Sequence, residues 1–157
     1  MKAHVQQLGE EETKVTISGT MGEDCQHILA SIEKEAKEVC LFNLRDLNGL
    51  NSLGVKNWVR FFQDFSQNRS ISFEECPSYF ISQVNMIPKI IGKASVKSFF
   101  AEYYCQNCEC DEDILMNGEV SYSEALKNIS SSKCPNCENI MDTVEEGEDF
   151  LSFMKDR

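Results

Sequence analysis

The sequence is poor in basic residues: 15 lysines and arginines face 26 aspartates and glutamates, and the formal net charge is −11. Proteins that hold nucleic acid by neutralising phosphates need surplus lysine and arginine, so this composition argues against nucleic-acid binding. Long hydrophobic runs are also lacking, since none approaches the roughly 18 apolar residues of a membrane-spanning helix. Residues 1–7 lack the apolar stretch of a signal peptide. We therefore expect a soluble, cytoplasmic protein without a membrane or nucleic-acid partner.

Recognisable catalytic motifs are missing as well. The sequence has no glycine-rich phosphate loop and no His-Glu-x-x-His motif, and its two histidines, His4 and His27, supply no general base near a convincing nucleophile. Carboxylates are plentiful, but no spacing singles out a catalytic pair. We therefore expect no enzymatic activity from this chain.

The pattern of apolar and turn residues predicts an α/β fold. The 157 residues, 41% of them hydrophobic, suffice for one generous domain or two small ones. Strands are expected at residues 4–8, 13–18, 39–44, 71–73 and 96–104, and helices at 24–37, from 55 to about 67 and from 77 onward. This order implies a mixed sheet of four to five strands with helices packed on it.

The eight cysteines are unevenly distributed. Cys25, Cys40 and Cys76 are isolated within apolar patterns, whereas the others cluster around two Cys-x-x-Cys pairs, Cys105 with Cys108 and Cys134 with Cys137. Two such pairs, 25 residues apart, suit tetrahedral zinc, and four thiolates close the coordination shell, so we predict a structural Zn²⁺ site. The alternative is a pair of redox-active dithiols. Cys110 is a candidate to replace Cys108, but the spacing favours Cys108.

The acidic residues are concentrated in the last third of the chain. Residues 105–157 hold 13 acidic and 4 basic side chains, which leaves residues 1–104 nearly neutral at −2. The acidic clusters at 111–113 and 145–149 are interpreted either as solvated surface or as docking surfaces for a basic partner.

Residues 46–55, Asp-Leu-Asn-Gly-Leu-Asn-Ser-Leu-Gly-Val, resemble the signature of STAS domains, the anti-sigma factor antagonist family. In that family a strand ends in Asp-Leu, and Asp-Ser-Ser-Gly then opens a helix. Residues 16–20 are similar to the family's Leu-x-Gly-Glu-Leu segment, and Cys76-Pro77 before a helix also fits. The resemblance covers about residues 3–104. It implies a STAS-like domain over 1–104, completed by a C-terminal helix over 145–157. The zinc ribbon, over 105–140, is then an insertion; the alternative is an appended ribbon with a free acidic tail.

The resemblance also implies a function. In the family, the first serine of Asp-Ser-Ser-Gly is phosphorylated by a partner kinase that is also the anti-sigma factor, and phosphorylation abolishes binding. Ser52 matches that serine, while Asn51 and Leu53 replace the family's aspartate and second serine. The other interpretation makes Ser52, or the competing Asn51, the N-cap of the helix. The implied protein is a non-catalytic signalling adaptor that binds an anti-sigma factor or serine kinase through Asn51, Ser52, Leu53 and Lys56. Two alternatives remain: a zinc- or thiol-based redox sensor, and a small enzyme with an unrecognised pocket.

Overall fold

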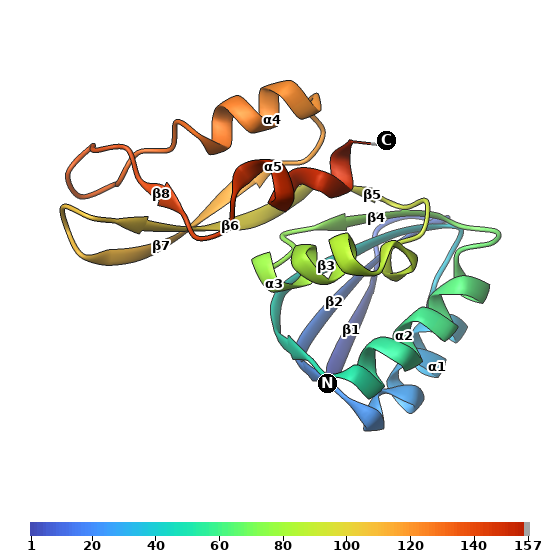
Figure 1. Ribbon diagram of the computed structural model, residues 1–157. Coiled ribbons are helices and arrows are strands. Elements are labelled where there is room, and N and C mark those ends of the chain that lie inside the picture. Colours follow the sequence, from blue (N-terminus) through green and yellow to red (C-terminus); the bar gives the residue numbers. More distant parts are fainter. Residues whose placement is uncertain (156–157) are drawn as a thin grey trace.

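The computed structural model describes residues 1–155, which form two β-sheets with helices packed against them (Figure 1). The strands are β1 (Lys2–Gln7), β2 (Glu12–Met21), β3 (Val39–Leu50), β4 (Ser70–Glu74), β5 (Ser95–Val96), β6 (Ser98–Cys105), β7 (Cys110–Asn117) and β8 (Asp142–Thr143). The helices are η1 (Glu23–Cys25), α1 (Gln26–Glu35), α2 (Ser52–Phe65), α3 (Ser78–Met86), η2 (Pro88–Ile90), α4 (Tyr122–Ile129), α5 (Gly147–Phe150) and η3 (Leu151–Met154). The predicted fold class, a mixed α/β sheet with packed helices and a small cysteine-bearing element, is confirmed.

The first sheet has the strand order β1-β2-β3-β4-β5. The expected opening hairpin is present, because β1 pairs antiparallel with β2, and the remaining neighbours pair parallel. Each parallel connection passes through a helix, and right-handed crossovers in one direction place α1, α2 and α3 on the same face. The opposite face of this sheet therefore carries no helix from this part of the chain (Figure 1).

An aromatic cluster fills the space between the first sheet and its helices. The ring of Phe42 on β3 packs against Trp58 on α2 at a centroid distance of 5.6 Å and against Phe73 on β4 at 5.4 Å. Trp58 also stacks on Phe62, one helical turn further along α2, and its Nε1–H donates a hydrogen bond to the carbonyl of Ile90. The aromatic residues that recur at helical spacing in α2 therefore form the buried face of the helix.

The strand expected over 96–104 is divided between the two sheets. Only residues 95–96 pair with β4; after Lys97 the chain enters β6, the central strand of the second sheet. The two sheets are not fully separate. Cys76 and Phe99 form an isolated β-bridge, and the Phe100 N–H donates to the Cys76 carbonyl. The change of sheet has a physical reason: β6 pairs with β7 along its whole length, and it buries Phe99 and Tyr103 against the C-terminal helices while it keeps contact with α3.

We call residues 1–97 the first lobe and residues 98–155 the second lobe. In the second lobe, α4, α5 and η3 cover one face of the small sheet, with Phe150 and Phe153 packed on Phe99 (Figure 1). The C-terminal helix expected over 145–157 is two short turns, α5 and η3, and residues 156–157 lie outside the described part. The division into a domain over 1–104 and an insertion over 105–140 stays a prediction.

Candidate functional site: a four-cysteine cluster and the start of helix α2

The four predicted zinc ligands lie together at the far end of the second lobe. The Sγ atoms of Cys105, Cys108, Cys134 and Cys137 are all within 4.8 Å of one another. Cys105 ends β6 and Cys108 lies in the turn to β7, whereas Cys134 and Cys137 lie in the loop between α4 and β8. Residues almost 30 positions apart in the sequence thus converge on one point, as the paired Cys-x-x-Cys spacing predicted.

The sulfur separations fit a tetrahedral metal. Cys105 Sγ lies 3.6 Å from Cys137 Sγ, and Cys134 Sγ lies 3.9 Å from Cys108 Sγ. Four sulfurs at about 2.3 Å from a central zinc would be about 3.8 Å apart. A disulfide requires about 2.05 Å, so neither pair is bonded. The donor set therefore suits a structural zinc ion, and it offers no open position for a water molecule or substrate.

The two cysteine turns share a local conformation. Each has the sequence Cys-x-Asn-Cys-Glu, and the glutamate adopts a left-handed backbone, with φ of 51° at Glu109 and 60° at Glu138. Non-glycine residues enter this region rarely, so its presence in both turns marks a shared geometry. The repeated asparagine and glutamate are the sequence signal that would have predicted the two turns to be alike.

The electrostatics of the cluster favour a bound cation. The backbone N–H of Asn136 lowers the pKa of Cys134 to about 7, which favours its thiolate. The neighbouring thiols, Cys137 first, raise the pKa of Cys108 to about 12, because four such groups cannot all ionise without a counter-charge. Cys110 lies outside the group of four, and its sulfur is 4.0 Å from Asn136 Nδ2.

The second candidate site is the start of α2. Asn51, in extended conformation, is the N-cap, because its side chain accepts a 2.8 Å hydrogen bond from the Gly54 N–H. Ser52 is the first residue of the helix, and both it and Leu53 are exposed, Leu53 by half of its surface. Asn51 therefore caps the helix, and the Ser52 hydroxyl is not needed as the N-cap.

Gly54 holds this helix start close to the end of β2. A Cβ added at Gly54 would lie 2.1 Å from the carbonyl oxygen of Met21, so no larger residue fits without moving the helix. The Asn51 N–H donates to that same carbonyl, at 3.1 Å. Lys56 is exposed on the next turn. The backbone at the start of α2 is therefore fixed, while the side chains at 52, 53 and 56 face solvent.

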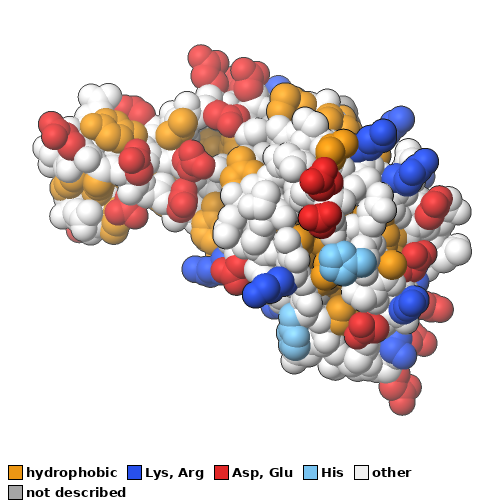
Figure 2. Space-filling model, turned by 90° about the horizontal axis from the view of Figure 1, so that it is seen from below, with side chains coloured by type: hydrophobic (Ala, Val, Ile, Leu, Met, Phe, Trp, Pro, Cys, Tyr) orange, Lys and Arg blue, Asp and Glu red, His pale blue; other side chains and the backbone are white. Residues whose placement is uncertain are grey.

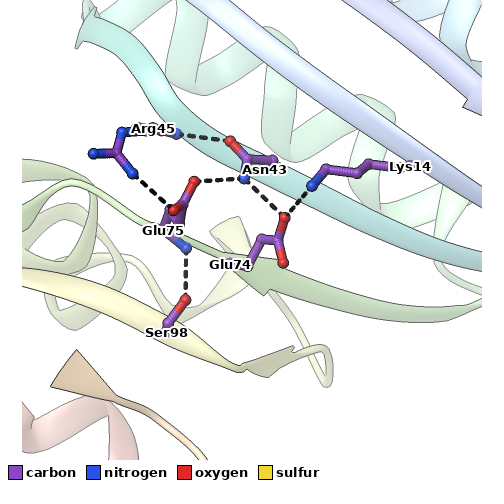
Figure 3. A network of polar contacts seen from close by, with 6 residues as sticks. All are labelled: Lys14, Asn43, Arg45, Glu74, Glu75 and Ser98. Carbon is purple, nitrogen blue, oxygen red and sulfur yellow. Dashed lines mark hydrogen bonds and ion pairs between the residues drawn. The ribbon is translucent and has the colours of Figure 1, made fainter. Parts of the chain in front are cut away.

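A polar network that sequence reasoning missed lies on the helix-free face of the first sheet (Figure 3). Asn43, only 6% exposed, donates from Nδ2 to Glu74 at 2.8 Å and to Glu75 at 2.7 Å. Lys14 pairs with Glu74 at 2.7 Å, and Arg45 with Glu75 at 2.9 Å. The Glu75 N–H donates to the Ser98 hydroxyl, so the network reaches the first residue of the second sheet. It therefore links the two lobes.

One open groove of the molecule is lined by no acid–base pair among the described residues. The groove, of about 690 Å³, lies between α3 and η3, and Lys93 is the ionisable side chain that lines it. Within residues 1–155, moreover, no helix is both long and apolar enough to cross a bilayer. The enzyme and redox-sensor alternatives stay hypotheses to which no further residues are assigned.

Comparison with known proteins gives a fold likeness only. The sequence matches no family model and no curated protein. Among solved structures, the chain is similar to the anti-sigma factor antagonist SpoIIAA in its unphosphorylated form. The sequence identity is 13% and the TM-score 0.46, over 56% of this chain and 82% of that one. A likeness of this degree assigns neither activity nor partner to this chain.

Proposed function

We propose that this chain is a non-catalytic signalling adaptor of the anti-sigma-factor-antagonist type, which binds a protein partner through the start of α2. The observation that carries the proposal is the combination of a fixed backbone and exposed side chains at Ser52, Leu53 and Lys56. Leu53 offers apolar surface for docking, and its surroundings need no rearrangement before a partner binds. The resemblance of residues 46–55 to the STAS signature supports the same surface.

Ser52 is the proposed regulatory position, and a serine kinase that is also the anti-sigma factor is the proposed partner. At the first position of a helix, a phosphate would lie beside the free N–H groups and the positive end of the helix dipole. It would also add a double negative charge beside Leu53, at the centre of the docking surface. Phosphorylation would therefore weaken binding through desolvation and charge rather than by unfolding the helix.

The binding test is site-specific photocrosslinking in the source cells. A photoreactive amino acid at Lys56 should capture a discrete partner, whereas the same group at Glu33, exposed on α1, should not. Ser52→Asp and Leu53→Asp should each abolish the product from position 56. A product that both variants retain, or that position 33 gives equally, would exclude this surface. Intact mass from the same cells, compared with Ser52→Ala, shows whether Ser52 carries the phosphate.

We also propose that Cys105, Cys108, Cys134 and Cys137 hold one structural zinc ion and that Cys110 is not a ligand. Native and denaturing mass spectrometry of the full chain should differ by a single zinc. Cys108→Ser should lose the metal, whereas Cys110→Ser, the matched control, should keep it. Metal loss in both variants, or in neither, would contradict the assignment. The described cysteines form no disulfide, which agrees with a reducing compartment, and we propose the cytoplasm.

A further inference from the structure

The outer face of the second sheet is mostly exposed. Two residues of the first lobe reach it: Ser78 donates a hydrogen bond to Glu102, and the Arg45 guanidinium lies over the Phe100 ring. Alternation along β6 sends Phe99, Ala101 and Tyr103 inward, where they are buried beneath the C-terminal helices. The alternate residues on all three strands point the other way. We define the acidic face by six of these: Glu102 and Tyr104 on β6, Asp111, Asp113 and Leu115 on β7, and Asp142 on β8.

The register places the carboxylates of this face beside one another. Glu102 lies directly opposite Asp113, and Tyr104 lies between Asp111 and Asp142 on its two neighbouring strands. Like charges directly opposite each other destabilise a sheet. Burial, Glu102 and Asp111 together raise the pKa of the Asp113 carboxyl above its ordinary value. The six residues of the face include no basic one. Arg45 of the first lobe approaches the face at Phe100, opposite Leu115, with its guanidinium 5.6 Å from the ring centroid.

Exposed apolar side chains lie among these carboxylates. Leu115 is 48% exposed and Tyr104 38% exposed, and Val144, just beyond β8, is 60% exposed. Charge alone suffices to protect a sheet from unwanted pairing. Protection against pairing does not explain why Leu115, Tyr104 and Val144 are exposed beside the charges. A surface that mixes apolar and charged side chains is typical of binding sites.

The long edge of this sheet is also free. Strand β7 is an edge strand, with β6 on one side and no strand on the other within residues 1–155. In an antiparallel pair of strands, hydrogen-bonded and non-hydrogen-bonded residue pairs alternate. The Gly118 N–H donates to the Lys97 carbonyl, so this pair is hydrogen-bonded and sets the type of every later pair between β6 and β7. Asp111, Asp113 and Leu115 are therefore non-hydrogen-bonded with respect to β6, and their backbone groups point outward. The same three residues thus present both an open backbone edge and the side chains of the acidic face.

The charge of the lobe selects the occupant. Residues 105–157 carry 13 acidic and 4 basic side chains, and in Figure 2 the projecting end of the molecule shows acidic but no basic side chains. A second copy paired edge to edge along β7 would place Asp111 and Asp113 against like charges. Nucleic acid and anionic membranes are repelled for the same reason. A basic protein segment removes the repulsion instead of adding to it.

We propose that an extended, basic segment of a partner protein binds along β7 as a fourth strand, with lysine or arginine side chains beside Asp111 and Asp113 and an apolar one beside Leu115. Main-chain hydrogen bonds to the open edge would supply affinity, and the alternating carboxylates would select basic residues at every second position. The edge of β7 belongs to the second lobe, whereas the start of α2 belongs to the first lobe. The adaptor could therefore engage this segment and its α2 partner at separate places.

The test uses the full chain and a fluorescein-labelled nonapeptide with lysine at two alternate positions, valine at the next alternate position and threonine elsewhere, so that valine lies beside Leu115. We expect binding that weakens steeply with salt, and backbone amide signals of Asp111, Asp113 and Leu115 that shift in an NMR titration. Asp111→Asn with Asp113→Asn should weaken binding at least about tenfold, because both charge pairs are lost. Leu115→Pro should weaken it similarly, since proline removes an outward N–H.

Two controls separate strand pairing from general charge attraction. Glu119→Gln with Glu124→Gln removes the same charge from exposed positions outside the acidic face and should change affinity by less than about twofold. A peptide with prolines in place of the central non-lysine residues keeps every lysine but cannot pair as a strand, and should bind at least about tenfold more weakly. Equal losses in the two double variants, equal binding of the proline peptide, or NMR shifts confined to other residues would each overturn the proposal. Self-association through β7 in sedimentation experiments, abolished by Leu115→Pro, would instead assign the edge to a second copy.

Discussion

At the scale of single residues, Asn43 shows how one buried amide organises charges on an otherwise open sheet. Its two donor hydrogens go to two different carboxylates, Glu74 and Glu75, which carry the ion pairs to Lys14 and Arg45 (Figure 3). Burial raises the pKa of the Glu74 carboxyl, but hydrogen bonds from Asn43 and Lys14 outweigh it and hold the pKa below its ordinary value. The native state therefore stabilises the ionised form of Glu74.

Asn43→Leu should lower the free energy of unfolding by about 2–4 kcal/mol at pH 7, because two partly buried carboxylates lose their donor. A lowered native pKa contributes stability above the unfolded pKa and loses it as the pH falls through the native value. The difference from the parent protein should therefore shrink below about pH 4. Urea unfolding of the variant and the parent protein, at pH 7 and again below about pH 4, measures this difference in the free energy of unfolding. Thr16→Val, on the neighbouring strand of the same face, is the control, and an equal loss there would refute the role of Asn43.

Asp113→Asn should have the opposite effect on stability. Because the native pKa of Asp113 is raised, ionisation costs the folded state more than the unfolded one, and stability declines as the pH rises through that value. The variant should be more stable than the parent at pH 7 by about 0.2–1 kcal/mol, the usual range for a cross-strand like-charge pair. The gain should vanish once Asp113 is protonated, near pH 3. Thermal unfolding at the two pH values decides it, and a gain that persists at low pH would point to another cause.

At the scale of elements, the start of α2 depends on contacts that the sequence indicates only in part. The helical spacing from Val55 to Phe65 predicted the helix, and both Asn51 and Ser52 were recognisable as caps. The choice between them was not predictable, because it depends on which side chain reaches the Gly54 N–H. The close approach of Gly54 to Met21 was equally hidden, since it joins residues of separate elements.

Gly54→Ala should destabilise the protein by about 1–3 kcal/mol, because its Cβ would collide with the Met21 carbonyl and push the helix away from β2. Asn51→Ala, which removes only the cap, should cost about 1 kcal/mol. Thermal unfolding followed by circular dichroism measures both. Gly9→Ala is the matched control, since nothing lies within 4 Å of an added Cβ there. A Gly54→Ala variant as stable as this control would contradict the close packing.

The second lobe marks the limit of sequence reasoning at this scale. Spacing alone predicted which four cysteines converge, because the geometry of thiolate sites constrains a Cys-x-x-Cys turn locally. The aromatic segment from Val96 to Tyr104 was predicted as one strand, since strand propensity does not say which sheet a strand joins. Its division at Lys97 follows from long-range pairing with β7 and from the helices that cover Phe99 and Tyr103.

At the scale of the whole molecule, removal of metal should affect the two lobes unequally. A strong zinc chelator should expose the four thiols to alkylation and lower the stability of the second lobe, because the two cysteine turns then lose the link between them. Trp58, the single tryptophan, is buried in the first lobe and bonded to Ile90, so its fluorescence maximum should not shift. A red-shifted emission after chelation would show instead that the first lobe depends on the metal.

The junction at Lys97 has a mechanical consequence. A single residue separates β5 from β6, the Lys97 N–H is bonded to the Phe73 carbonyl, and the Cys76–Phe99 bridge spans the same point. A joint this short and this strongly bonded cannot act as a swivel. Two proteins bound at opposite ends of the molecule would therefore be held at a set distance and angle, and the chain would serve as a rigid spacer between them.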